Sequence, residues 1–195
     1  MGFKTKVKQL TSGNVEYGKV LISDGNSGFT FTDMSISSGT TFPGSPTGGT
    51  LYYRTDVDLL FYYDGSRSKW FTIDGSTLSC GRTSATAGGT VYLRVGDATM
   101  TSTSGFRMFR NGTIIGASAN NDNTLTAAKA IDIRVNNSTV NRVILTIPSG
   151  TTGVITNSAN LDFSAENLIQ VVSTPGSVGS KLSNIIVTIE IAFRI

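Results

Sequence analysis

The stretch SPTGGTLYYRTDVDLLFYYDGSRSKWFTI, residues 45–73, gathers many rings into a few strand-like segments. LYYRTD and LLFYYDG read as strands joined by a DVD turn, and an Asp-Gly turn leads into a third short strand that holds the only Trp. Side chains alternate across a strand, so Leu51 and Tyr53 share one face while Tyr52 and Arg54 share the other. Both faces carry rings, and a lone hairpin of this size is marginal in water. We therefore predict that copies of the chain or another protein cover this hairpin.

Downstream of this stretch, residues 78–195 show a regular series of short apolar runs between turn-forming residues. This spacing predicts an antiparallel sandwich or jelly roll. The expected strands are 89–95, 105–110, 113–119, 130–136, 141–147, 152–156, 167–173 and 184–194. In the last strand, Val187, Ile189, Ile191 and Phe193 alternate with other residues, which predicts a central strand with this face in the core. Weak helix signals occur only at 164–168 and 125–130.

Upstream of the aromatic stretch, residues 1–50 carry too little apolar mass to bury a core of their own. Two short strands are expected at 19–23 and 28–32, followed by a linker rich in Gly, Ser, Thr and Pro. We predict an extended arm that orders against a partner, with its cations meeting an acidic surface. The predicted attachment residues are Phe3, Lys4, Lys6, Val7, Lys8, Leu10, Lys19, Val20 and Ile22.

The expected fold class is therefore all-β, in three parts. An extended N-terminal arm occupies residues 1–50, an aromatic β-hairpin neck residues 51–77, and a jelly-roll β-sandwich residues 78–195.

Composition excludes several classes of chemistry. The chain has no His and a single Cys, Cys80, which excludes His-based catalysis, His metal ligands, a Cys-rich zinc site and an internal disulfide. We therefore expect no enzyme activity and no cofactor. The net charge of +3 without a long basic run argues against nucleic acid as a partner. No apolar segment of about 18 residues is present to span a membrane.

Three local features have two interpretations each. Asp56, Asp58 and Asp64 lie close in sequence and predict either a calcium site or simple turn formation, and turn formation is favoured because no spaced series of oxygen ligands ends in Glu. The run 120–123 is either a calcium loop or a polar loop tip. Cys80 lacks a His partner anywhere in the chain, which predicts an inert small residue at the start of the sandwich.

Several stretches resemble segments of tailed-bacteriophage virion proteins. PTGGTLYYRTDVDLLFYYDGSRSKWFTI (46–73) resembles a widespread motif with a Pro-x-x-Gly turn, two aromatic strands and a Trp, and GKVLISDGNSGFTFTD (18–33) resembles a second segment. GFRMFRNGTIIGASA, AIDIRVNN, NLDFSAENLIQVV and IIVTIEIAFRI resemble strands of the tumour-necrosis-factor-like jelly rolls found in such proteins. The usual Gly-Asp pair after FSA is Glu166–Asn167 here, which still suits a turn.

This resemblance implies a non-enzymatic structural protein on the surface of a phage particle, made in the bacterial cytoplasm. Within this class we expect a homotrimeric capsid decoration or cement protein that binds the major capsid protein, because the chain is short for a fibre, has no repeat shaft or coiled coil, and has a basic N-terminus. The alternative is a small tail-fibre, head-fibre or baseplate protein that binds a host receptor or surface glycan, with Tyr92, Phe106 or Phe109 stacking on sugars. The predicted trimer interface is Leu51, Tyr52, Tyr53, Phe61, Tyr62, Tyr63, Trp70 and Phe71. The other interpretation of these rings is a satellite core that caps one end of the sandwich.

Overall fold

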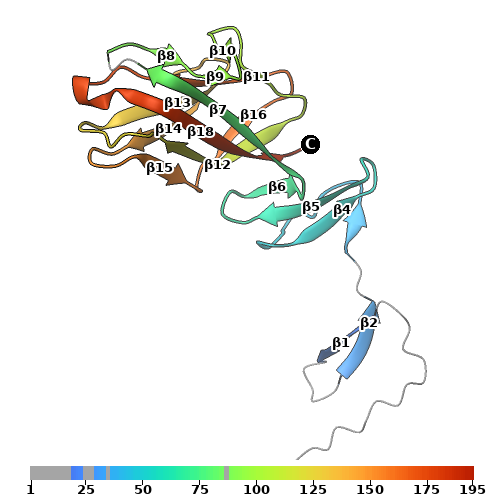
Figure 1. Ribbon diagram of the computed structural model, residues 1–195. Coiled ribbons are helices and arrows are strands. Elements are labelled where there is room, and N and C mark those ends of the chain that lie inside the picture. The colour runs from blue at the N-terminus through green and yellow to red at the C-terminus, as the bar shows by residue number, and fades with distance from the viewer. Residues whose placement is uncertain (1–18, 24–28, 34–35, 86–87) are drawn as a thin grey trace, which may run out of the picture.

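The computed structural model of the chain describes residues 19–23, 29–33, 36–85 and 88–195. The prediction of an all-β fold with a C-terminal sandwich is confirmed: in these ranges the chain forms strands and one short 3-10 helix, η1 (Val178–Ser180). Figure 1 shows the sandwich at one end and a smaller four-stranded sheet beside it, with the C-terminal end near their junction. Within the described ranges, no helix is long and apolar enough to cross a membrane.

The first sheet of the sandwich has the strand order β10-β9-β7-β18-β12-β15, and β16 also pairs with β12. Its two longest strands, β7 and β18, pair antiparallel over most of their length. The bounds are β7 (Gly75–Ala85), β9 (Arg94–Val95), β10 (Ala98–Thr99), β12 (Gly112–Asn120), β15 (Gly153–Thr156), β16 (Leu161–Phe163) and β18 (Leu182–Phe193).

The second sheet has the order β11-β17-β13-β14, and β8 also pairs with β17. Its bounds are β8 (Val91–Tyr92), β11 (Phe106–Arg107), β13 (Lys129–Val135), β14 (Arg142–Ile147) and β17 (Leu168–Ser173). Pairing in the sandwich is nested, because β7 pairs with β18, β11 with β17, β12 with β15 and β16, and β13 with β14. Two further ladders, β12 with β18 and β17 with β13, complete the two sheets.

The core lies between the two sheets. As predicted, Val187, Ile189, Ile191 and Phe193 on β18 are all buried. They belong to one hydrophobic cluster that also contains residues of β12, β13, β14 and β17. A bulge between Ile114 and Gly116 shifts the register of β12 against β18. The alternating sequence pattern of β18 thus indicates what the structure has, a central strand with one buried face.

Most sandwich strands lie within a few residues of their predicted positions, but four details differ. The stretch 89–95 is split into β8 and β9 at Leu93, whose side chain turns into the core. β7 and β10 were not predicted because their sequences lack apolar alternation, and β16 was not predicted because it has only three residues. The segment 164–168 contains a turn with Glu166 at φ 68°, where a helical residue has negative φ. The segment 125–130 runs into β13 and is not helical.

The four-stranded sheet forms the neck and contains β3 (Ser38–Gly39), β4 (Leu51–Arg54), β5 (Leu59–Asp64) and β6 (Lys69–Thr72). The hairpin β4–β5 and the third aromatic strand, β6, occur as predicted. β3 was not predicted and pairs parallel with β4. The neck sheet therefore includes Ser38 and Gly39, which lie within the segment predicted as the arm.

The arm is described only in part. β1 (Lys19–Ser23) and β2 (Phe29–Asp33) form an antiparallel hairpin close to the predicted strands, and three predicted attachment residues, Lys19, Val20 and Ile22, lie in β1. The other six lie outside the described residues: Phe3, Lys4, Lys6, Val7, Lys8 and Leu10.

Candidate functional site

One face of the neck sheet is closed by a single ring from the preceding linker. Phe42 stacks on Trp70 with ring centroids 4.7 Å apart and planes 4° apart, and meets Phe61 edge-on at 5.1 Å. The Arg54 guanidinium lies 4.8 Å from the centre of the same ring, and Tyr52 packs at 6.0 Å. Offset and edge-to-face ring pairs of this kind each stabilise by about 0.5–1.5 kcal/mol beyond their buried area. Phe42 therefore acts as the lid of this face.

The opposite face of the neck sheet turns partly toward the sandwich. Phe71 is fully buried and packs against Tyr62, with ring centroids 5.8 Å apart. Burial raises the pKa of Tyr62, and the negative charges of Asp64 and Glu190 add to the rise although Arg67 opposes it. Glu190 lies on β18, and β18 contacts β6 of the neck sheet.

Burial in one chain changes the interpretation of the predicted trimer interface. Tyr52 is 8% exposed, and Phe61 and Phe71 have no exposed surface. These three rings are already covered by their own chain, so the premise that both faces need a neighbouring subunit is wrong. The other predicted residues stay accessible, since Leu51 is exposed and Tyr53, Tyr62, Tyr63 and Trp70 are partly exposed. Their role in a trimer remains a prediction.

Arg67 joins the neck to the sandwich. It lies in the turn between β5 and β6, and its Nε donates to the Ala159 carbonyl oxygen at 2.8 Å. Its Nη2 donates to the carbonyl oxygens of Ile115 at 2.8 Å and Asn157 at 2.7 Å. Its Nη1 pairs with the Asp64 carboxylate at 2.5 Å, which holds the guanidinium in place. One side chain thus links the neck turn to β12 and to the connection between β15 and β16.

A second cation reinforces this junction. The Lys69 ammonium on β6 pairs with the Asp162 carboxylate on β16 at 2.6 Å and also donates to the Asn160 side chain. Burial alone would raise the pKa of Asp162, but hydrogen bonds from Lys69 and Thr113 and the charge of Arg194 outweigh it and hold the pKa below its usual value. The neck and the sandwich are therefore joined by charged hydrogen bonds, which are stronger than neutral ones.

The turn aspartates each serve a local contact. Asp56 pairs with Arg54 at 2.6 Å, Asp58 accepts a hydrogen bond from the Tyr53 hydroxyl, and Asp64 accepts from the Ser66 and Arg67 backbone N–H groups. In the described residues, no group of three or more Cys, Asp or Glu side chains is arranged to hold a metal ion. The favoured prediction of turn formation agrees with these contacts.

The run 120–123 is more than a polar loop tip. Asn121 is only 1% exposed, its Oδ1 accepts from the Ser183 backbone N–H at 2.6 Å, and its Nδ2 donates to the Asn123 carbonyl at 2.6 Å. Asp122 accepts from the Asn184 amide at 2.6 Å. These residues therefore fasten the end of β12 to the start of β18, a role that the sequence did not indicate.

Of the three rings considered for sugar stacking, one is free to contact a ligand. Phe109 is 70% exposed, with Arg110 5.5 Å from its centre. Tyr92 is partly buried and donates to the Asn137 side chain at 2.8 Å, while Phe106 packs against the core. Cys80 lies on β7 and is buried in the core, and burial raises the pKa of its thiol to about 12.

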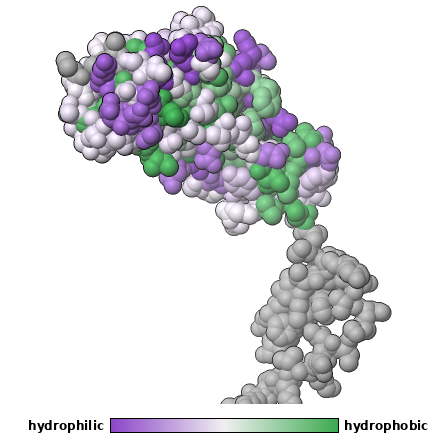
Figure 2. All heavy atoms as spheres, viewed as in Figure 1, coloured by the Kyte–Doolittle hydropathy of each residue, from purple (hydrophilic) through white to green (hydrophobic). Residues whose placement is uncertain are grey.

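Figure 2 shows apolar residues gathered on the neck sheet next to the sandwich. Three apolar residues of the neck, Leu51, Val57 and Ile73, are exposed. Comparison with known proteins found no matching family model, no matching curated protein and no matching solved structure.

Proposed function

We propose that this chain is a non-enzymatic structural protein of a tailed-phage particle, a homotrimeric decoration or cement protein that binds the major capsid protein. The motif resemblance of residues 18–33 and 46–73 supports the virion assignment. The structural observation that carries the proposal is the Arg67 junction, which holds the sandwich on the neck through three backbone carbonyls and one carboxylate. A sandwich that is held firmly on the neck suits a protein that decorates a regular lattice.

The nested strand pairing supports a jelly roll as the form of the sandwich. β7 pairs with β18, β8 and β11 pair with β17, β12 pairs with β15 and β16, and β13 pairs with β14, while β9 and β10 form a hairpin beside β7. One long hairpin rolled up on itself gives this order, because the roll brings β18 beside β12 and β17 beside β13. Jelly rolls are one of the architectures by which two antiparallel sheets share a core.

Attachment is proposed to reside in the N-terminal residues. Lys4, Lys6, Lys8 and Lys19 supply positive charge near apolar residues such as Phe3. Contacts between such cations and an acidic capsid surface would speed docking and weaken as salt screens them. The sandwich would then face away from the capsid.

The test is binding to particles of the encoding phage that were produced without this protein. A truncated protein that starts at Ile36 keeps β3 and Phe42, so its neck sheet retains its lid. We expect it to fold and trimerise but to leave the particles undecorated, while the full chain decorates them. Equal decoration by both proteins would reject the arm as the anchor.

A matched variant separates charge from apolar contact. The full chain with Lys4, Lys6 and Lys8 changed to Gln keeps its length and its apolar residues. We expect weaker binding to the particles, with a smaller dependence on salt than the unaltered chain shows. Binding that is unchanged in strength and in salt dependence would reject the acidic capsid surface as the partner of these cations.

The alternative is an adhesin at the tail, and the exposed Phe109 ring favours it. Phe109 tilts against Phe193 with centroids 5.3 Å apart, and Arg110 lies near both rings. An exposed ring beside a cation can stack on a sugar and bind its hydroxyl groups. Binding to a glycan array that is lost in Phe109→Ala, together with a tail position in particle images, would favour this function over capsid decoration.

A further inference from the structure

The outer face of the first sheet carries two exposed isoleucines. The ladders place Gly81, Ile186 and Asn120 in one outward row, and Ser79, Thr188, Ser118 and Ile155 in the next. Ile186 is 55% exposed and Ile155 is 78% exposed, whereas Val187, the neighbour of Ile186 on β18, is fully buried. The remaining side chains of these rows are small or polar. Both isoleucine side chains therefore project from a surface of small or polar side chains.

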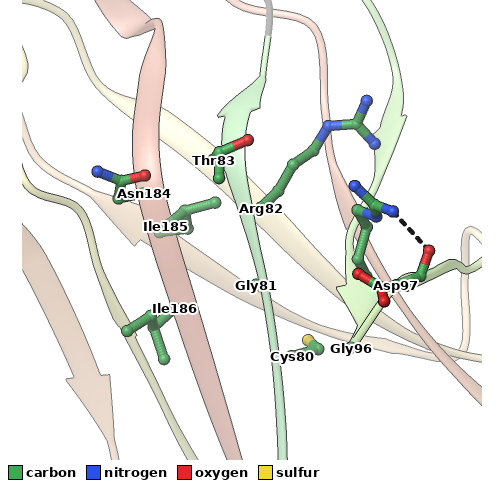
Figure 3. Close-up of a pocket in the computed structure, with 10 residues that line it drawn as sticks. Cys80, Gly81, Arg82, Thr83, Gly96, Asp97, Asn184, Ile185 and Ile186 are labelled. Atoms are coloured by element: carbon green, nitrogen blue, oxygen red, sulfur yellow. Dashed lines mark hydrogen bonds between the residues drawn. The ribbon is translucent and has the colours of Figure 1, made fainter.

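A hollow of about 420 Å³ lies beside Ile186 and is called the basic hollow here (Figure 3). It is lined by Cys80, Gly81, Arg82, Thr83, Arg94, Gly96, Asp97, Asn184, Ile185 and Ile186. Gly81 packs closely against β18 beside it, because a Cβ there would meet the Ile185 carbonyl oxygen at 2.6 Å. Arg82 and Arg94 donate to backbone carbonyls, and among the described residues neither pairs with a carboxylate. With Asp97 included, the lining carries one net positive charge.

A second hollow of about 250 Å³ lies beside Ile155 and is called the acidic hollow here. It is lined by Thr77, Ala117, Ser118, Ile155, Thr156, Asn157, Thr188 and Glu190. Glu190 is its charged residue, and its Oε2 leans over Gly116, 2.9 Å from where a Cβ would stand. In the part of the chain that the structure describes, no Lys or Arg forms an ion pair with Glu190.

The two hollows complement each other. An exposed isoleucine lies beside each hollow, and the residues that line the two hollows carry net charges of opposite sign. A surface that carries both halves of a complementary pair can be completed by another copy of itself. A contact in which one region meets a different region of the next copy closes into a ring when the rotation allows.

We infer that the outer face of β7, β18, β12 and β15 is a contact face between copies of this chain. The acidic hollow of one copy, with Glu190 and Ile155, meets the basic hollow of the next, with Arg94 and Ile186. This inference rests on the proposed homotrimer and adds to it the surface that holds the subunits together.

The experiment measures the molar mass of the full chain by light scattering after size exclusion, over a range of concentrations. We expect a trimer for the unaltered chain and a threefold lower mass for Glu190→Arg and for Arg94→Glu. The double variant Glu190→Arg/Arg94→Glu exchanges the charges, so we expect it to recover the trimer. Ile155→Lys should also give the monomer. Ile144→Lys is the matched control, because Ile144 is 50% exposed on β14 in the other sheet, and it should stay trimeric.

The outcomes separate the two proposals. If the unaltered chain is trimeric and Glu190→Arg, Arg94→Glu and Ile155→Lys remain trimeric, this face is not the contact and the homotrimer stands. If the single variants dissociate with native circular dichroism but the double variant does not recover, the pairing of Glu190 with Arg94 is rejected. A monomeric unaltered chain at every concentration rejects both the homotrimer and the contact face.

Discussion

At the scale of single residues, Arg67 shows how one side chain can connect two parts of a chain. Its guanidinium reaches three backbone carbonyls in the sandwich and one carboxylate in the neck. Only a planar group with several fixed N–H donors can serve so many acceptors at once, and a Lys ammonium cannot. The side chain is 14% exposed, so these bonds are largely removed from competing water.

We expect Arg67→Met to lower the free energy of unfolding by about 2–3 kcal/mol, since hydrogen bonds to charged groups contribute roughly 1.5–3 kcal/mol and carbonyls would lose their donors. Arg67→Lys should recover only part of this loss. Urea denaturation of the full chain provides the measurement. Arg107→Met is the control, because the Arg107–Glu166 pair is 62% and 77% exposed and such surface pairs contribute little. Equal effects of Arg67→Met and Arg107→Met would contradict the role of the junction.

Cys80 supports a second expectation at this scale. Burial raises the pKa of its thiol to about 12, so very little reactive thiolate exists near neutral pH. We expect iodoacetamide to label the native chain at least about a hundredfold more slowly than the urea-unfolded chain at the same pH. Labelling followed by intact mass provides the rates. Rapid labelling of the native chain would show that the β7 thiol is accessible.

At the scale of elements, the neck sheet depends on a ring that lies outside its predicted strands. Phe42→Ala removes the stack on Trp70 and the edge contact with Phe61, and we expect a loss of roughly 2 kcal/mol for this half-buried ring. Trp70 is the only Trp, so intrinsic fluorescence reports on this site directly. We expect a red-shifted emission in Phe42→Ala.

Phe109→Ala provides the matched control for that change. Phe109 is 70% exposed and packs on Phe193, away from Trp70. The Phe109→Ala variant should leave the fluorescence emission of Trp70 unchanged. If Phe42→Ala also leaves the emission unchanged, Phe42 does not cover Trp70 in solution.

The strands also show how much of the fold sequence patterns can predict. β18 was predicted well, because Val187, Ile189 and Ile191 alternate with residues that face outward. β7 was missed, because its outward residues are small or polar and its inward side chains give a weak apolar signal. The lid residue Phe42 was missed because it is one ring within a Gly- and Ser-rich linker. The acceptors of Arg67 are backbone carbonyls far along the chain, which no local pattern can indicate.

At the scale of the whole molecule, the joined neck and sandwich should respond to acid together. The pKa of Asp162 is held below its ordinary value of 3.8 in the folded chain. A lowered folded pKa gives stability that is present above the ordinary value and is lost as the pH falls through the folded pKa. We expect the free energy of unfolding to fall as the pH drops below 3.8, and Asp162→Asn to be less stable near neutral pH with a shallower acid dependence. Urea denaturation across this pH range gives both curves, and parallel curves would contradict the assignment.

The nested pairing also sets the order in which the chain can fold as it is synthesised. β18 lies in the middle of its sheet, between β7 and β12, yet it follows every other strand of the sandwich in chain order. Until β18 emerges, β7 and β12 lack the strand that pairs with both of them, so each has an open edge. The core also lacks Val187, Ile189 and Ile191. Such distant pairings fold slowly and leave edges exposed to aggregation. A nascent chain halted before β18 should therefore remain open to protease, and the sandwich should close only after β18 has left the ribosome.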